Sequence, residues 1–99
     1  DLVRRFVRAS VKAFDAAVAD PDASVAVGLK LKPDAERELW RKQLDTGIGL
    51  MKTPATKGLP TGAFAESDWQ ATVDLMKKYQ GLETDKPASA FFTNEFLPK

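Results

Sequence analysis

The sequence predicts an all-α fold of about four helices, followed by an aromatic-rich C-terminal segment, in a single helical region that spans residues 1–99. Apolar residues recur at three- and four-residue spacing in several stretches, and each stretch is bounded by helix start or stop signals. The one stretch that alternates like a strand has no second run to pair with, and a lone strand leaves its backbone groups unpaired. The composition, with 43% hydrophobic and 29% charged residues, is that of one globular domain.

The first helix is expected from Leu2 to Ala19, where the larger apolar residues fall on one face. These residues are Val3, Phe6, Val7, Val11, Phe14 and Val18. Four basic residues form a stripe outside that face, namely Arg4, Arg5, Arg8 and Lys12. We interpret the stripe as a solvated helix face, because nearby aspartates offset its charge and no aromatic residues interleave with it. The alternative is that the stripe binds phosphate or an anionic partner.

A second helix is expected to begin at Asp20-Pro21-Asp22 and to stop before Lys32-Pro33. The first aspartate is a good N-cap, proline suits the first helical position, and an acid suits the first turn. The rival interpretation is a strand, because apolar residues alternate strictly at Val25, Val27, Leu29 and Leu31. We favour the helix, since its start signals are specific.

Pro33-Asp34 repeats the same opening, so a third helix is expected from there to about Lys52, with Trp40 on its apolar face. Oppositely charged residues at i,i+4 spacing are expected to stabilise this helix on its solvent-facing side. These pairs are Glu38 with Lys42 and Arg41 with Asp45.

Residues 53–62 hold two prolines and two glycines and are expected to form a loop. A fourth helix is then expected to open at Ser67, whose hydroxyl would form a capping box with Gln70 three residues later. Trp69 lies on its apolar face, where packing in the core is the usual fate and stacking on a ligand is the alternative. Gly81 closes this helix at a C′ position.

The final segment, Leu82–Lys99, ends in a cluster that contains Phe91, Phe92 and Phe96. A solvated tail would not usually carry three phenylalanines, so we expect the segment to dock on a surface, either of this chain or of a part outside it. A partner-binding groove is the alternative. Where exposed, the same three residues would allow self-association.

Several classes of function are disfavoured by what the sequence lacks. It has no cysteine and no histidine, which removes thiolate sites, the commonest general base and the commonest metal ligand. A net charge of +1 disfavours nucleic-acid binding, and no apolar run is long enough to cross a membrane. We therefore expect no enzyme activity, no metal and no cofactor. The Lys57–Gly62 loop lacks the Gly-Lys-Ser/Thr ending of a phosphate loop. The acidic residues fall at helix starts, where capping explains them: Asp20, Asp22, Asp34, Glu36, Glu66 and Asp68.

Taken in order, several strings resemble the C-terminal region of periplasmic substrate-binding proteins of ABC transporters. The family is the nitrate/sulfonate/taurine and thiamine-pyrimidine-precursor superfamily, and the likeness runs along nearly all 99 residues. The strings are Leu2-Val3-Arg4-Arg5-Phe6-Val7-Arg8-Ala9, Asp20-Pro21-Asp22-Ala23, Leu31-Lys32-Pro33, Lys57-Gly58-Leu59-Pro60, Trp69-Gln70-Ala71-Thr72-Val73-Asp74-Leu75, Lys78-Tyr79 and Phe92-Thr93-Asn94-Glu95-Phe96-Leu97-Pro98.

The resemblance implies that this chain is the C-terminal fragment of a two-lobed α/β binding protein of type II. It implies a periplasmic or exported protein that captures a small organic or anionic solute between its lobes and delivers it to an ABC permease. No solute-binding residue can be assigned in this stretch. The related eukaryotic pyrimidine-precursor synthases look similar in fold but use histidine and a cysteine-rich motif, which this stretch lacks. A free-standing helical interaction module is the alternative function.

Overall fold

The computed structural model describes all 99 residues, and they form four α-helices and one short 3-10 helix without any strand. The helices are α1 (Leu2–Ala19), α2 (Pro21–Leu31), α3 (Arg37–Leu50), α4 (Glu66–Gln80) and η1 (Ala88–Ala90). The predicted all-α class is confirmed. None of the helices combines the length and the apolarity that crossing a membrane requires.

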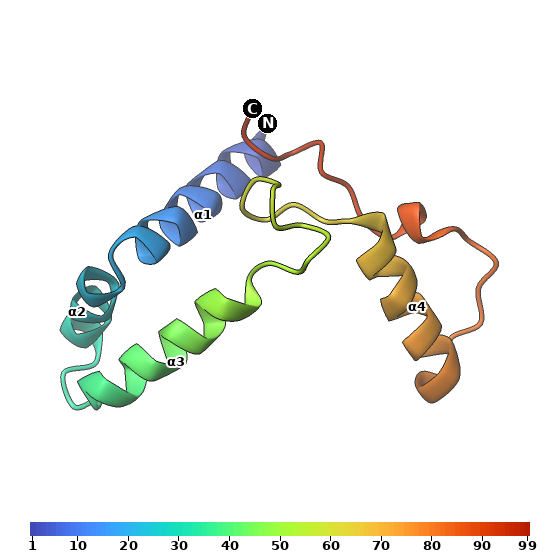
Figure 1. Cartoon of the computed structure of the whole chain (residues 1–99). Helices are drawn as coiled ribbons and strands as arrows, with labels where there is room; N and C mark the ends of the chain where they lie inside the picture. Colours follow the sequence, from blue (N-terminus) through green and yellow to red (C-terminus); the bar gives the residue numbers. More distant parts are fainter.

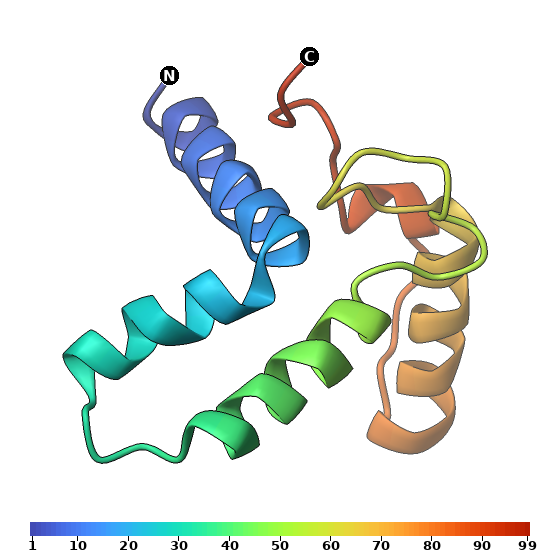
Figure 2. The same cartoon turned by 60° about the vertical axis from the view of Figure 1, so that its left-hand side comes forward.

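The helices form an open arch rather than a closed bundle (Figure 1). One arm consists of α1, α2 and α3, and the other consists of α4 and η1, with the 51–65 segment between the two arms. The two ends of the chain lie on the same side of the arch, where Arg4 contacts Glu95 and Phe96. A second view shows α2 and α3 running back along each other (Figure 2).

The surface of the arch is large for its mass. A compact monomer of 10.9 kDa exposes roughly 5,600 Å² by general scaling, whereas this chain exposes 7716 Å². Its radius of gyration is 16.7 Å, against about 13 Å for a compact domain of this length. Only four residues are buried, namely Val25, Thr56, Val73 and Ala88. Much apolar surface therefore lacks a partner within this chain.

The first two helices begin and end as their sequences predict. α1 spans the expected residues, and Asp20 then caps α2, because its carboxylate accepts a hydrogen bond of 3.0 Å from the backbone N–H of Ala23. The alternating residues of α2 are helical, so the strand interpretation is wrong. Val25 from this helix is one of the buried residues.

The third helix starts later than predicted, at Arg37 instead of Pro33-Asp34. Residues 32–35 form a turn, which the backbone N–H of Ala35 closes by donating to the carbonyl of Lys32. The chain uses these residues to reverse direction, and the reversal brings Trp40 of α3 onto Gly28 of α2. The helix stops at Leu50, two residues before the expected end.

One of the two expected ion pairs on α3 forms. Arg41 donates to Asp45 at 3.0 Å and also bonds to Asp22 of α2, so its guanidinium joins the two helices. Hydrogen bonds that Arg41 donates to Asp22, and next to Asp45, raise its pKa above the ordinary value, and the group stays charged throughout the physiological range. Glu38 and Lys42 do not form an ion pair.

The capping box predicted for α4 is wrong. The helix begins at Glu66, one residue before Ser67, and its N-cap Ala65 makes no side-chain hydrogen bond. Gln70 bonds forward to Asp74 instead of back to the cap. Phe64, which precedes the N-cap residue, contacts Trp69 and Phe92 and bonds to Asn94. These contacts fix the direction in which the chain enters α4. The predicted end is confirmed, because Gly81 adopts the left-handed conformation with φ of 68°.

The contact between α2 and α3 should be sensitive to a single methyl group at Gly28. A Cβ atom there would lie 2.5 Å from Cζ3 of Trp40, well inside van der Waals contact. We expect Gly28→Ala to lower the free energy of unfolding by about 1 kcal/mol, since overpacking outweighs the gain in helix propensity. Gly47→Ala is the matched control. A Cβ at Gly47 meets nothing within 4 Å, so this change should raise stability by about 0.5–1 kcal/mol. Urea denaturation followed by circular dichroism measures both, and a stabilising Gly28→Ala would contradict this packing.

The Asp22–Arg41 ion pair should contribute a small, salt-sensitive coupling energy between α2 and α3. A double-mutant cycle of Asp22→Asn and Arg41→Gln should give a measurable coupling at low salt and a value near zero in 1 M NaCl. The Asp1–Arg5 pair is the control, because it lies at 3.6 Å with both side chains well exposed and should show no measurable coupling. Equal coupling for the two pairs would argue against a role for Arg41 in joining the helices.

Candidate functional site

The largest hollow in the chain, about 400 Å³ in volume, lies between the 51–65 segment and the first turns of α4. A hollow of this size falls within the range of pockets for small organic ligands. Its lining combines hydroxyls, aromatic rings and one carboxylate. The residues are Met51, Thr53, Thr56, Gly62, Ala63, Phe64, Ala65, Asp68, Trp69 and Thr72.

Two threonines and an aspartate hold the polar wall of the hollow in place. The backbone N–H of Thr53 donates to the Oγ1 of Thr56 at 2.9 Å, and the hydroxyl of Thr53 donates to the carboxylate of Asp68. Thr56 is itself buried, with its hydroxyl satisfied by Thr53. This network ties the loop to α4 and leaves the second carboxylate oxygen of Asp68 without a protein partner among these bonds. Asp68 was expected to serve helix capping, and its side chain instead anchors the loop.

The aromatic side chains of the lining, Phe64 and Trp69, pack with Phe92 in a cluster of three rings, which we call the aromatic cluster. The rings of Trp69 and Phe92 stack with an interplanar angle of 16° and centroids 5.8 Å apart. Phe64 meets Trp69 edge to face at 5.7 Å and Phe92 at 5.9 Å. Such pairs contribute beyond the area that they bury. The cluster joins the loop, α4 and the C-terminal segment.

Asn94 fastens the C-terminal segment to the same place. Its amide oxygen accepts from the backbone N–H of Phe64 at 2.9 Å, and its amide nitrogen donates to the carbonyl of Phe64 at 2.9 Å. Leu97 lies against Gly62, where a Cβ atom would come within 3.3 Å of the Leu97 side chain. Gly62 has a positive φ of 85°, so glycine suits both the conformation and the close approach.

The predicted docking of the C-terminal phenylalanines is confirmed for two of the three. Phe92 is half-buried in the aromatic cluster, and Phe96 is half-buried beneath Arg4. Only Phe91 is exposed, at 37%. The expected exposure is therefore wrong for Phe92 and Phe96, because they pack within the chain, and self-association stays a prediction.

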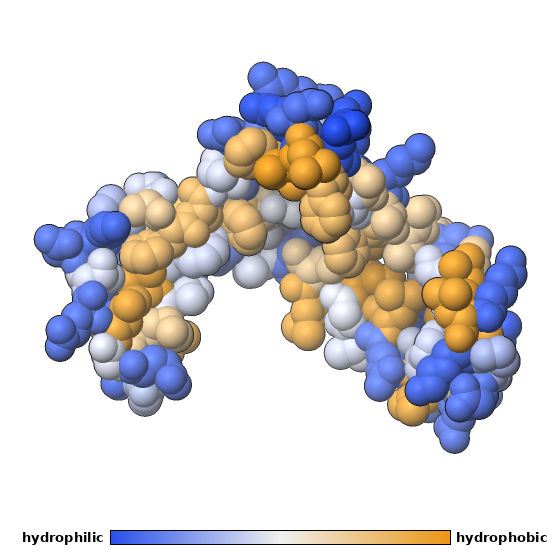
Figure 3. Space-filling view, turned by 180° about the vertical axis from the view of Figure 1, so that it is seen from behind, coloured by the Kyte–Doolittle hydropathy of each residue, from blue (hydrophilic) through white to orange (hydrophobic).

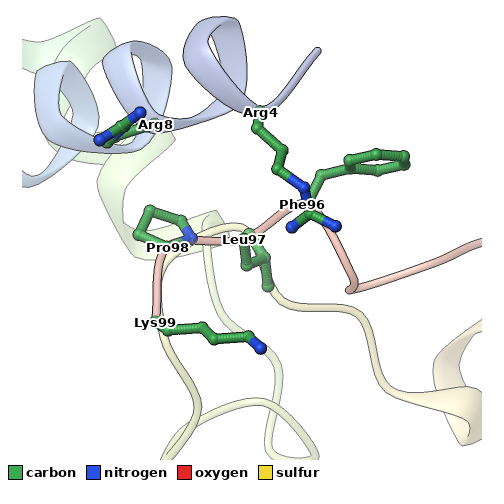
Figure 4. Close-up of a pocket in the computed structure, with 6 residues that line it drawn as sticks. All are labelled: Arg4, Arg8, Phe96, Leu97, Pro98 and Lys99. Carbon is green, nitrogen blue, oxygen red and sulfur yellow. The ribbon is translucent and has the colours of Figure 1, made fainter. Parts of the chain in front are cut away.

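The basic stripe of α1 is mainly solvated, as expected, apart from one residue that contacts the C-terminal segment. Arg4 donates to the backbone carbonyl of Glu95 at 2.7 Å, and its guanidinium lies 5.3 Å from the ring centroid of Phe96. Figure 4 shows this contact beside a second, smaller hollow of about 220 Å³. Arg8 and Lys99 also line it, and their side chains point in different directions. Three cations therefore border this hollow without converging on one point.

The chemistry available at the larger hollow is that of non-covalent recognition. Hydroxyls and a carboxylate can hydrogen-bond to a solute, and the aromatic cluster offers apolar surface to a ring. No group of three or more acidic side chains is placed to hold a metal ion. The sequence analysis assigned Trp69 to packing, and the structure gives it packing together with a place in the lining. The threonines carried no sequence signal, because their role depends on the path of the loop.

Comparison with known proteins gives one informative match. The chain is 29% identical to the riboflavin-binding protein RibY of Chloroflexus aurantiacus over an alignment of 101 residues. The alignment takes in 99% of this chain and 29% of the relative, so the chain spans less than a third of the relative's length. No family model matches the sequence.

The two hydrogen bonds of Asn94 should be needed to hold the C-terminal segment against the loop. Asn94→Asp keeps one acceptor but replaces the donor with an oxygen that faces the carbonyl of Phe64. We expect a loss of about 0.5–1.5 kcal/mol in the free energy of unfolding, and faster hydrogen exchange in residues 91–99. Gln43→Glu makes the same chemical change at an exposed position of α3 and should stay within about 0.5 kcal/mol. Equal effects of the two changes would mean that these bonds do not fasten the segment.

Proposed function

We propose that this chain is part of a solute-binding protein that captures a small organic solute without covalent chemistry. The observation that carries the proposal is the similarity to a riboflavin-binding protein, which extends over 99% of the chain. The hollow beside α4 offers the types of group that capture requires, with hydroxyls and a carboxylate on one side and aromatic rings on the other. A planar, ring-containing solute matches this lining best.

The binding site of such a protein needs a second wall, which this chain does not provide. A hollow lined by one side only gives weak affinity, because tight pockets bury most of the ligand surface. Closure around a solute also needs contacts that are better in the closed state, and these must come from both sides of the site. We propose that further polypeptide supplies the second wall and that the complete protein delivers its solute to the permease of an ABC importer outside the cytoplasm. The order of residues supports the nitrate/sulfonate/taurine and thiamine-pyrimidine-precursor superfamily proposed from the sequence.

A chimera tests the solute-binding role. In it, this chain replaces the aligned segment of the riboflavin-binding relative. We expect the chain alone to bind riboflavin with a Kd weaker than about 100 µM, because it offers one wall, and the chimera to bind at about micromolar or better. Isothermal titration calorimetry measures both.

Two controls accompany that titration, namely the unaltered relative and the relative from which the aligned segment has been deleted. A chimera that unfolds cooperatively but does not bind riboflavin would contradict the solute-binding role for this ligand class. Micromolar binding by the chain alone would contradict the need for a second wall.

The alternative is a free-standing helical interaction module, which the exposed apolar residues of α1 favour. Light scattering separates the two proposals. A monodisperse species of 10.9 kDa would favour the module, whereas aggregation through uncovered apolar surface would favour a part of a larger protein.

A further inference from the structure

The apolar face of α1 is wider than the surface that covers it. At about 100° per residue, its apolar side chains span roughly half of the helix circumference. One edge of this face contacts the rest of the chain, where Val7 and Val11 are partly buried and Val11 lies beside Gly62. The other edge carries Leu2 and Phe6, which are 73% and 72% exposed.

This exposed edge continues along the helix at heptad-like spacing. Leu2 and Phe6 are followed by Ala9 and Ala13, and all four are exposed. The side chains of this edge are large near the start of the helix and small further along. Another element can therefore approach α1 closely beside the two alanines. We call these four residues the α1 edge. Hydrophobic side chains also face solvent on both arms of the arch in a space-filling view (Figure 3).

Positive charge borders the α1 edge along its length. Arg5 and Lys12 lie on that side of the helix, whereas Arg8 faces the C-terminal segment. Arg5 has only a long, exposed pair with Asp1, and Lys12 forms no ion pair. A second copy packed edge to edge on α1 would bring like charges together, which is unfavourable. The occupant that fits has apolar side chains opposite Phe6 and carboxylates opposite Arg5 and Lys12.

The excess exposed surface of this chain indicates that the occupant is large. The chain exposes roughly 2,000 Å² more than a compact monomer of its mass, which is as much as one side of a large obligate interface buries. The relative is more than three times as long as the segment that this chain matches. We propose that the α1 edge docks on the remaining polypeptide of the solute-binding protein, on an apolar surface bordered by carboxylates. This inference rests on the proposed function.

Cysteine labelling in the chimera tests the docking, because this chain has no cysteine of its own. Phe6→Cys places a small, weakly polar side chain at the centre of the α1 edge. Lys42→Cys places the same thiol at an exposed position of α3, outside the α1 edge, as the matched control. In the chimera we expect a maleimide to react at least tenfold more slowly at position 6 than at position 42, since the thiol at position 6 is covered. In the chain alone, the two positions should react at similar rates.

The outcomes separate this inference from the proposed function. Equal labelling at both positions of a chimera that binds riboflavin would overturn the docking and leave the solute-binding role standing. Protection of position 6 in a folded chimera that binds no riboflavin would support the docking and contradict that role. A chimera with no cooperative thermal transition would also count against the docking, because the remaining polypeptide would then not accept this face.

Discussion

The burial of apolar surface is the constraint on which the rest of this structure depends. Each helix has an amphipathic pattern that requires a partner, and the chain provides that partner for only part of each face. Trp40 on Gly28 joins α2 to α3, and the aromatic cluster joins α4 to the loop and the C-terminal segment. Between these two contacts the arch stays open, with three apolar residues buried. Since hydrophobic burial dominates folding free energy, a chain with so small a core is expected to gain much from a further partner.

The same constraint explains how the polar interactions are distributed. Hydrogen bonds at the candidate site close the loop onto α4 and the C-terminal segment onto the loop, and no buried side-chain polar atom lacks a partner. The ion pairs lie at the surface, where each adds little. Polar bonds therefore position the segments around the hollow, while the open apolar faces define where further polypeptide can pack. Solute capture and the docking of α1 are linked, because both require further polypeptide.

Local signals in the sequence predicted most of the helices. The features that they did not predict depend on contacts between residues far apart in the sequence. Helical spacing with Asp20-Pro21 and Gly81 located α1, α2 and the end of α4, since these signals act within one or two turns. The start of α3 was missed because the turn at Pro33 depends on how Trp40 meets α2. The capping box predicted at Ser67 does not form, because Asn94 holds Phe64, thirty residues away from it, and sets the entry into α4. The role of the lining threonines could not be predicted for the same reason, because only the folded loop brings Thr53 to Asp68.

The mass of the natural protein tests the central claim most directly. The account predicts that the chain purified from its source, measured by intact-protein mass spectrometry, is several times heavier than 10.9 kDa and contains these 99 residues as one part. A natural protein of 10.9 kDa that remains a stable monomer would contradict it, because the α1 edge would then have no remaining polypeptide on which to dock.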